Sequence, residues 1–317
     1  MGDKNATESI LADAAGIARA AEILRSGGLV AVPTETVYGL AARADNEEAV
    51  AKIYAAKGRP SFNPLIVHVR DAEHARSYAN LTGSASWLAE LEWPGPLTLV
   101  VPLNPDAGLA DAVSAGLPTV ALRAPAHPVM RALLEICEFP LAAPSANRSG
   151  FISPTSASHV AASLDERIDL ILDAGPCEKG LESTILAVRE DGSWEELRPG
   201  PVDLDALHRH YFDRGLERGA SGNSIEAPGQ LASHYAPGKP VRLNAERAEA
   251  DEFHIGFGAV AGDCSLSVSG NLAEAGSNLY ACLHEATGSD LPRIAVAPIA
   301  DTGLGKAIND RLRRASA

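Results

Sequence analysis

Two cationic side chains, an amide and an imidazole lie within the twelve residues of the segment KGRPSFNPLIVH, residues 57–68. Lys57 supplies a compact ammonium and Arg59 a planar guanidinium, and proteins use both groups to hold phosphate oxygens. Pro60 and Pro64 restrict the backbone around them. This segment is therefore suited to a polyanionic ligand such as a nucleoside triphosphate.

A second interpretation of the same segment needs no ligand. Asn46 can cap a helix over residues 47–57, Gly58 can end it, and Pro60 forbids its continuation. The two cations would then complement the negative end of the helix dipole. The residues alone give these two interpretations about equal weight.

Two apolar segments that we expect to be strands are each followed directly by small polar side chains. PTET at residues 33–36 follows residues 29–32, and PSAN at 144–147 follows residues 141–143. Open α/β sheets bind ligands at the carboxyl ends of their strands. Both segments are equally compatible with ordinary turn or helix-cap chemistry.

Arg123 ends the apolar segment 119–122, where an unpaired cation would be costly. It needs an anion, and a protein carboxylate and a substrate carboxylate or phosphate are equally good candidates. The segments ESTI at 182–185 and RPGP at 198–201 repeat this juxtaposition of a polar or charged group with an apolar strand.

Hydrophobic periodicity predicts an α/β fold in which these segments lie at strand ends. Helices are expected at residues 8–26, 84–91, 127–137, 156–164 and 203–210. Strands are expected at 29–32, 65–69, 97–101, 119–122, 141–143 and 170–172, and a hairpin at 185–188 and 195–198. A small αβ unit follows, with strands at 253–257 and 294–298 and helices at 271–286 and 305–314.

Composition divides the chain into three parts. Residues 1–210 form the predicted main domain, residues 211–238 are rich in Gly, Ser, Pro and charge and are interpreted as a linker, and residues 239–317 form the small second domain. A domain of about 80 residues has little core of its own, so we expect it to lean on the first.

The formal charge of −14 over 317 residues argues against a broad nucleic-acid or anionic-membrane surface. No apolar run is long enough to span a bilayer, and no secretory signal is evident. The four cysteines are widely spaced, without zinc-ligand spacing, and are expected to be reduced, buried thiols in a cytoplasmic protein. No protein metal site is expected.

Read in order, these motifs resemble those of one family. They are PTETVYGL (33–40), KGRPSFNPLIVH (57–68), WPGPLT (93–98), ALRAP (121–125), PSAN, ESTI and RPGP. In this order and spacing they are similar to the YrdC-like threonylcarbamoyl-AMP synthases. HYAP at 234–237 and GLGKAINDRL at 303–312 resemble the linker and the end of the added domain in the long two-domain form.

The resemblance implies a YrdC-type curved, open mixed sheet with helices, followed by a small C-terminal α/β domain. It also implies that L-threonine, bicarbonate (or CO2) and ATP become L-threonylcarbamoyladenylate and pyrophosphate. The product would pass to a separate tRNA threonylcarbamoyl transferase that makes N6-threonylcarbamoyladenosine, without stable tRNA binding here. Magnesium would arrive on the nucleotide phosphates.

The resemblance also implies roles for particular residues. The threonine pocket would be Thr36, His68, Arg123, Ala143 and Ser183. The ATP contacts would be Arg59, Asn63, Thr119, Ser145, Asn147, Ser153, Arg198 and Tyr235. Lys57, Arg59 and Arg198 would stabilise the charge of the transferred phosphoryl group.

This chain departs from the family at the linker, where APGQLASHYAP lacks the basic residue that often precedes His-Tyr. The main alternative function is a module that binds double-stranded RNA or tRNA without ATP turnover. Another is a carbamoyl-phosphate-using unit of hydrogenase maturation, although the zinc-finger cysteine spacing of such chains is missing here.

Overall fold

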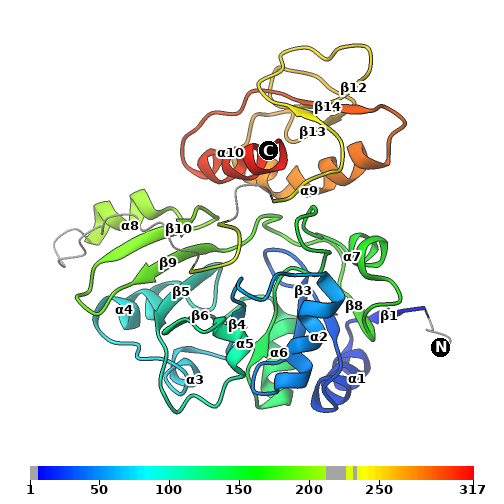
Figure 1. The fold of residues 1–317 in the computed structure, drawn as a ribbon. Coiled ribbons are helices and arrows are strands. Elements are labelled where there is room, and N and C mark those ends of the chain that lie inside the picture. Colours follow the sequence, from blue (N-terminus) through cyan, green and yellow to red (C-terminus); the bar gives the residue numbers. More distant parts are fainter. Residues whose placement is uncertain (1–5, 212–225, 231–233) are drawn as a thin grey trace.

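The structure is a computed structural model that describes residues 6–211, 226–230 and 234–317. Figure 1 shows two lobes, a larger one built from the chain up to α8 and a smaller one that carries α9 and α10. The two helices of the small lobe lie on its side facing the larger lobe (Figure 1).

The large lobe is built on a mixed sheet of ten strands in the order β1-β8-β2-β3-β7-β4-β6-β5-β9-β10. The strands are β1 (Glu8–Leu11), β2 (Val30–Val32), β3 (Gly39–Arg43), β4 (Ile66–His68), β5 (Leu97–Pro102), β6 (Thr119–Arg123), β7 (Leu141–Ala142), β8 (Leu170–Asp173), β9 (Thr184–Val188) and β10 (Trp194–Arg198). The mixed α/β sheet predicted from the sequence is confirmed.

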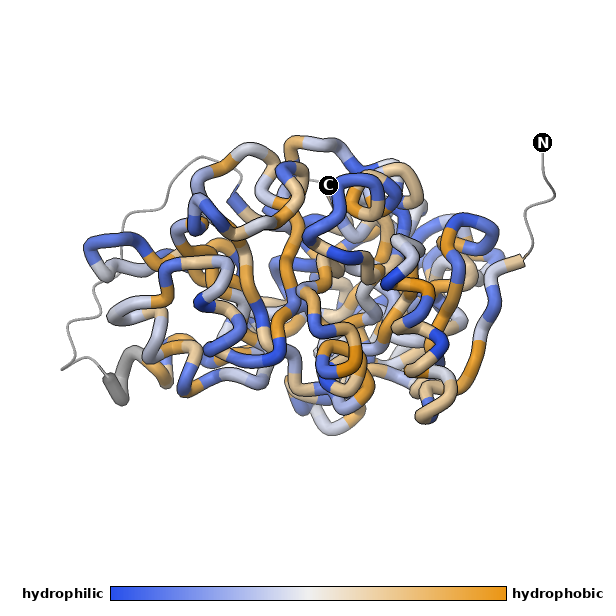
Figure 2. Tube along the Cα trace, turned by 90° about the horizontal axis from the view of Figure 1, so that it is seen from below, coloured by the Kyte–Doolittle hydropathy of each residue, from blue (hydrophilic) through white to orange (hydrophobic). Residues whose placement is uncertain are grey.

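Eight helices accompany this sheet in the part of the chain that the structure describes. They are α1 (Ala14–Arg25), α2 (Glu47–Lys57), α3 (Ala72–Ala75), α4 (Gly83–Glu92), α5 (Asp111–Ser114), α6 (Pro128–Cys137), α7 (Ala157–Leu164) and α8 (Leu204–Tyr211). Long hydrophobic runs cross the middle of the molecule, and many turns at its edge are hydrophilic (Figure 2).

The alternation of side chains along the strands divides the large lobe into two cores. Val30 and Val32 pack with α1 and α6 on one face of the sheet. Ala31, between them, belongs to the core on the other face, with residues of α2, α4 and α7. On the first face, residues of β4, β5, β6 and β9 form a separate apolar group with Ala227 of the linker, and this is the region where the site lies.

The small lobe has four parallel strands in the order β11-β14-β12-β13. Its elements are β11 (Val241–Arg242), β12 (Glu252–Gly256), β13 (Cys264–Ser265), α9 (Leu272–Gly288), β14 (Arg293–Val296) and α10 (Leu304–Ala315). Its core also contains Val37, Ile152 and Leu181 of the large lobe and Tyr235 of the linker. The small lobe therefore shares its core with the large one.

The structure corrects the sequence predictions at the start of the first helix and adds short elements that were not predicted. The helix predicted over residues 8–26 is wrong at its start, because residues 8–11 form the edge strand β1 and Asp13 caps a shorter helix by accepting from the amide of Gly16 at 2.8 Å. Strand β3 was not predicted; its Gly- and Ala-rich sequence has low strand propensity. The two-residue strands β11 and β13 and the four-residue helices α3 and α5 were not predicted either. The other predicted strands and helices are present, with ends shifted by at most two residues.

Three further expectations concern the linker, the cysteines and the membrane. Residues 212–225 and 231–233 of the predicted linker lie outside the described residues, so the domain boundaries stay a prediction. Cys137, Cys177 and Cys282 are buried as expected, whereas Cys264 is half-buried. No helix in the described part of the chain is long and apolar enough to cross a membrane.

Candidate active site

The centre of the site is one face of the paired strands β4 and β6. His68 on β4 lies opposite Arg123 on β6, and Ile66 lies opposite Ala121. Since alternate residues of a strand share a face, all four side chains are on the same side. Ala143 joins them, because its amide donates to the carbonyl of Ile66 at 3.0 Å.

Arg198 reaches this face because of an irregularity in β10. Glu196 pairs with Leu186, so in regular register Leu197 would pair with Ile185. Instead Arg198 pairs with Ile185. Such a β-bulge changes the side to which the following side chain points. Strict alternation would have turned Arg198 to the opposite face, away from His68 and Arg123.

Helix α2 ends where the sequence predicted, and its end brings Arg59 to the site. Asn46 caps the helix at the amide of Ala49, and Gly58 ends it with φ 59°, a left-handed conformation that glycine adopts without strain. The buried Arg59 guanidinium donates to the carbonyls of Asn63 at 3.1 Å and Pro64 at 2.8 Å. Burial lowers the pKa of Arg59 to about 10, so it is charged at neutral pH.

Lys57 belongs to the support of the site. Its buried ammonium donates to the carbonyls of Ser145 at 2.5 Å and Asn147 at 2.6 Å, and so fastens the PSAN turn to the end of α2. Burial, with a contribution from the nearby Arg59 charge, holds the pKa of Lys57 well below its usual range.

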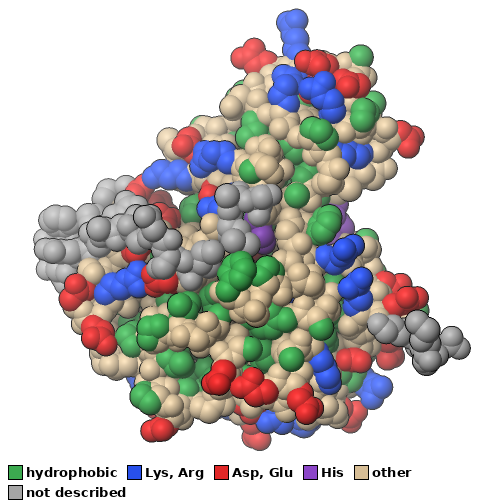
Figure 3. Space-filling model, in the orientation of Figure 1, with side chains coloured by type: hydrophobic (Ala, Val, Ile, Leu, Met, Phe, Trp, Pro, Cys, Tyr) green, Lys and Arg blue, Asp and Glu red, His purple; other side chains and the backbone are tan. Residues whose placement is uncertain are grey.

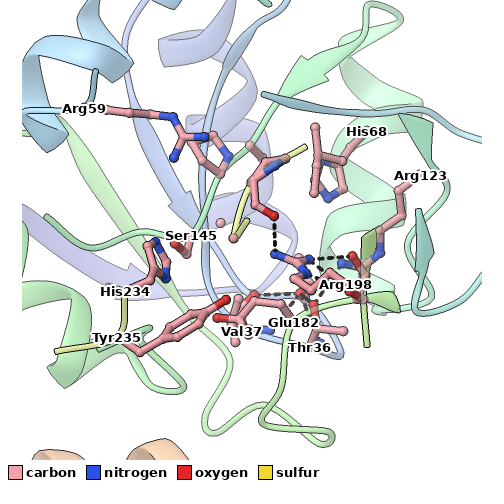
Figure 4. A pocket seen from close by; sticks show the side chains of 18 residues that line it. Thr36, Val37, Arg59, His68, Arg123, Ser145, Glu182, Arg198, His234 and Tyr235 are labelled. Atoms are coloured by element: carbon pink, nitrogen blue, oxygen red, sulfur yellow. Dashed lines mark hydrogen bonds between the residues drawn. The ribbon is translucent and has the colours of Figure 1, made fainter. Parts of the chain in front are cut away.

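These elements enclose one pocket, which Figure 4 shows from close by. Nine of the residues predicted from the sequence line it: Thr36, Arg59, His68, Arg123, Ala143, Ser145, Ser183, Arg198 and Tyr235. Five others do not: Lys57, Asn63, Thr119, Asn147 and Ser153. The roles of all of them stay predictions.

The predicted residues outside the pocket lie around it in different ways. The side-chain oxygens of Asn63 and Asn147 are buried and have no hydrogen-bond partner. Thr119 is on the same face of β6 as Arg123, at the other end of the strand. The hydroxyl of Ser153 donates to Glu182 at 2.5 Å.

Arg123 pairs with a protein carboxylate, which is one of the two kinds of anion that the sequence left open. It donates to Glu35 at 2.5 Å, to the hydroxyl of Thr36 at 2.9 Å and to the carbonyl of Gly95 at 3.2 Å. Burial alone would raise the pKa of Glu35, but the charge of Arg123 outweighs it and lowers that pKa. The pair therefore stays ionised inside the protein.

His68 is a neutral histidine beside this ion pair. Burial, together with the Arg123 charge, lowers its pKa to about 3. Its Nδ1 atom is buried and has no hydrogen-bond partner, although it lies in a pocket lined by polar groups. A neutral imidazole with a free nitrogen is suited to a hydrogen bond with a polar ligand.

Ser183 connects two parts of the site. Its hydroxyl bonds to that of Thr98 at 2.7 Å, and its carbonyl accepts from Arg198 Nε at 3.1 Å and Nη2 at 3.0 Å. Arg198 has no carboxylate partner among the described residues, so its charge faces the pocket without a counter-ion of its own.

The linker closes one side of the pocket. Gly229, with φ 87°, fits between Arg198 and Tyr235, where a Cβ atom would lie 2.9 Å from Arg198 Cδ and 3.1 Å from the Tyr235 hydroxyl. Tyr235 is fully buried and its hydroxyl has no partner, and neither has Nδ1 of His234. Pro228 also lines this side. The described part of the linker thus supplies polar atoms to the pocket as well as covering it.

Several pocket residues were given no role from the sequence. Thr34 and Glu182 lie in motifs that were noted, and Gly229 in the linker, but nothing in residue type or spacing distinguished them. Adjacency was the available signal for Glu182, which precedes Ser183. His234 also lines the pocket; because no basic residue precedes it, closure of the linker was expected to rest on His234 and Tyr235.

The pocket combines a cationic side with a neutral polar side. Arg59 and Arg198 give it positive charge, and Glu182 is the acidic residue among those that line it. No group of three or more His, Cys, Asp or Glu side chains in the described ranges could hold a metal ion. Such a pocket can hold an anion and, beside it, a small polar molecule.

Comparisons with known proteins agree with this arrangement. The Sua5_yciO_yrdC family model, described as "Telomere recombination", matches residues 22–200, and the Sua5_C model, described as "Threonylcarbamoyl-AMP synthase, C-terminal domain", matches residues 202–317. The chain is 40% identical to the threonylcarbamoyl-AMP synthase of Bacillus subtilis, over 95% of this chain and 92% of that protein. It is 37% identical to that of Pyrococcus abyssi, over 94% and 93%.

A solved structure extends the likeness to three dimensions. The crystal structure of P. abyssi Sua5 complexed with L-threonine matches with a TM-score of 0.86 at 36% identity, and the match covers 98% of this chain and 96% of that one. The chain thus belongs to the Sua5/YciO/YrdC family, in its long two-domain form.

Proposed function

We propose that this chain is an L-threonylcarbamoyladenylate synthase, which makes threonylcarbamoyl-AMP and pyrophosphate from L-threonine, bicarbonate or CO2, and ATP. Relatives of 37–40% identity over nearly the whole chain bear that name, which supports the proposal. The structural observation that carries it is a single pocket in which unpaired arginines adjoin polar atoms that have no partner.

We assign L-threonine to the side lined by Thr36, His68, Arg123, Ala143 and Ser183. Three of the five N–H groups of Arg123 are used by Glu35, Thr36 and Gly95, which leaves two for the carboxylate of the amino acid. The free Nδ1 of His68 and the nearby hydroxyls offer partners for the threonine hydroxyl.

We assign ATP to the side of Arg59 and Arg198. Ser145 and Tyr235, which also line the pocket, would contact the nucleotide there, and Asn63, Thr119, Asn147 and Ser153 would contact parts of it beyond the pocket. Lys57 acts in this proposal as a positioning residue, because its ammonium holds the backbone of Ser145 and Asn147.

The proposed chemistry needs no covalent nucleophile from the protein. The amine of threonine attacks the carbon of CO2 and loses a proton to give a carbamate, or it attacks the carbon of bicarbonate and gives the same carbamate with loss of water. A carbamate oxygen then attacks the α-phosphorus of ATP, the bond to the bridging oxygen breaks, and pyrophosphate leaves. Arg59 and Arg198 would align the phosphates and offset the negative charge of the transition state.

The donor set of the pocket fits magnesium carried by the nucleotide. Both oxygens of Glu182 already accept hydrogen bonds, from Ser153, Tyr280 and Arg311. No carboxylate lining the pocket is left to hold an ion alone, and Mg²⁺ commonly binds proteins through substrate phosphates. When bound, the ion would neutralise phosphate charge.

RNA binding without turnover is the function from another class that the sequence left open. It needs an extended basic surface, whereas the chain carries a net charge of −14 and the face in Figure 3 shows acidic and basic side chains interspersed. We therefore propose that the adenylate is released to a separate tRNA threonylcarbamoyl transferase without stable tRNA binding here.

The cytoplasm is the proposed compartment. The four cysteines are free thiols, the state that a reducing compartment maintains. ATP and bicarbonate are both available there.

Pyrophosphate release with different amino acids tests the function. We expect release to require ATP, bicarbonate and threonine together. Valine and alanine lack the hydroxyl and should be rejected strongly, whereas serine lacks one methyl group and should be weaker by about 1–3 kcal/mol in transition-state binding. Equal turnover of threonine and valine would contradict the assignment of the pocket.

A further inference from the structure

Glu182 is the point at which the small lobe reaches the pocket. It follows Leu181 on the approach to β9 and lines the pocket from the large lobe. From the small lobe, the hydroxyl of Tyr280 on α9 donates to its two oxygens at 3.0 and 2.9 Å. Nε of Arg311 on α10 donates to Oε2 at 2.9 Å. Two elements of the small lobe thus fix one acidic side chain of the site.

Arg311 is unusual because it is a fully buried arginine that crosses between lobes. Besides Glu182 it donates to Asp310 at 2.9 Å, and its guanidinium lies 5.5 Å from the centre of the Tyr235 ring, over its face. Its Nη2 atom is buried without a partner. Complete burial of an arginine is costly in free energy unless an anion buried beside it pairs with its charge.

The same acidic side chain lies close to a second cation. Glu182 and Arg198 line one pocket, and Arg198 donates to the carbonyl of Ser183, the residue next to Glu182. No ion pair joins Glu182 to Arg198 in the described structure, and Arg311 takes the carboxylate instead. Burial alone would raise the pKa of Glu182, but Arg311 and then Arg198 lower it to about 2, so the carboxylate is ionised.

We propose that Arg311 and Tyr280 are positioning residues that hold Glu182 away from Arg198, so that Arg198 stays free for the phosphates of ATP. This inference rests on the proposed function, in which Arg198 is an ATP contact. The small lobe thereby has a defined role in the site. It supplies Arg311 as the counter-ion of Glu182, and this keeps Arg198 unpaired.

The reason is competition for one buried charge. A buried carboxylate that loses its partner must find another cation or become protonated. Arg198 shares the pocket with Glu182 and pairs with no carboxylate in the described ranges of the chain. Without Arg311, Glu182 would pair with Arg198, and ATP would have to displace it.

The test measures ATP-analogue affinity by isothermal titration, and KM for ATP and for threonine, in the full-length protein. For Arg311→Gln we expect the affinity for ATP to fall about tenfold or more, the scale of one charge-assisted phosphate contact. The KM for threonine should change much less. Arg313→Gln is the matched control, because Arg313 is on the same helix and exposed.

The decisive variant is the double change Arg311→Gln with Glu182→Gln. Removing the carboxylate leaves nothing to pair with Arg198, so ATP affinity should recover most of what Arg311→Gln lost. If Arg311 only holds the lobes together, the second change adds to the damage and no recovery occurs. That result would overturn the inference.

Tyr280→Phe keeps the test decisive if Arg311→Gln does not fold. It removes one hydroxyl and preserves the ring, and we expect a smaller loss of ATP affinity that Glu182→Gln again reverses. Unchanged ATP affinity in both single variants would contradict the inference. If the unaltered protein binds no ATP analogue, the proposed function itself fails, and the two failures are thereby distinguished.

Discussion

Arg59 and Arg198 show how the charge of the pocket is kept available. Both guanidinium groups are buried and donate to backbone carbonyls, and neither pairs with a carboxylate among the described residues. Carbonyl partners orient an arginine without neutralising it. A phosphate that enters therefore meets charge that is already desolvated and fixed in direction.

Arg59→Ala should lose nucleotide affinity while the fold survives. The loss of one charge-assisted contact to phosphate should cost about 1.5–3 kcal/mol of binding free energy. Isothermal titration with a non-hydrolysable ATP analogue measures it. Arg19→Ala is the control, because Arg19 is exposed on α1 in a weak surface ion pair. Affinity equal to that of the unaltered protein would remove Arg59 from the phosphate site.

His68 makes the stability of the protein depend on pH. Its pKa is about 3 in the folded protein against 6.5 for the unperturbed group. Between these values the unfolded chain binds a proton that the native protein does not, so the free energy of unfolding falls as the pH falls below 6.5. For this group the slope approaches about 1.4 kcal/mol per pH unit.

Urea unfolding of the unaltered protein and of His68→Gln at pH 7.5, 6 and 5 tests this account of His68. The variant lacks the titrating group, so its free energy of unfolding should decline less steeply with acid. If the free energies of unfolding of the two proteins decline in parallel across this pH range, His68 is not held neutral by burial.

At the level of elements, the bulge in β10 is the feature on which the site depends most. It turns Arg198 to the face that carries His68 and Arg123. Nothing in the sequence WEELRPGP signals it, because alternation along the strand predicts the opposite face. The family resemblance could point to Arg198 as a candidate ATP contact, but the sequence could not show how its side chain reaches the pocket.

Other elements followed more directly from the sequence. The sequence signals both ends of helix α2, with a cap at Asn46 and a stop at Gly58. It also contains a recognisable turn between strands β9 and β10. Short strands were the weak point, since β1 has only four residues and the Ala-rich β3 lacks the β-branched residues by which strands are recognised. The pairing of Arg123 with Glu35 and the hydrogen bonds of Glu182 could not be predicted, because they join residues far apart in the chain.

The linker provides the next prediction. Tyr235 is buried against the pocket and packs in the core of the small lobe, which fits a segment that covers the site. A carbamate and an adenylate both react with water, so the cover should protect them. Tyr235→Ala should therefore consume ATP while yielding less intact product.

The ratio of product formed to ATP consumed is the quantity to measure in Tyr235→Ala. Phe62→Ala is a suitable control, because Phe62 is an exposed aromatic residue that does not line the pocket. If Tyr235→Ala makes product at the full rate without extra ATP hydrolysis, the linker only joins the two lobes.

The two lobes form one structure at the scale of the whole molecule. The core of the small lobe includes side chains of the large one, and the contacts of Glu182 with Tyr280 and Arg311 cross the same junction. The chain is acidic overall, yet its pocket is cationic. Binding of an anionic ligand therefore depends on this local arrangement, which both lobes and the linker build.

The most direct test of the account is the identity of the product. The full-length protein is incubated with ATP, threonine and 13C-labelled bicarbonate, and the adenylates are analysed by mass spectrometry. We predict threonylcarbamoyl-adenylate that is heavier by one mass unit than the product from unlabelled bicarbonate, together with pyrophosphate. If ATP binds but no adenylate containing both threonine and the labelled carbon forms, the central claim is wrong.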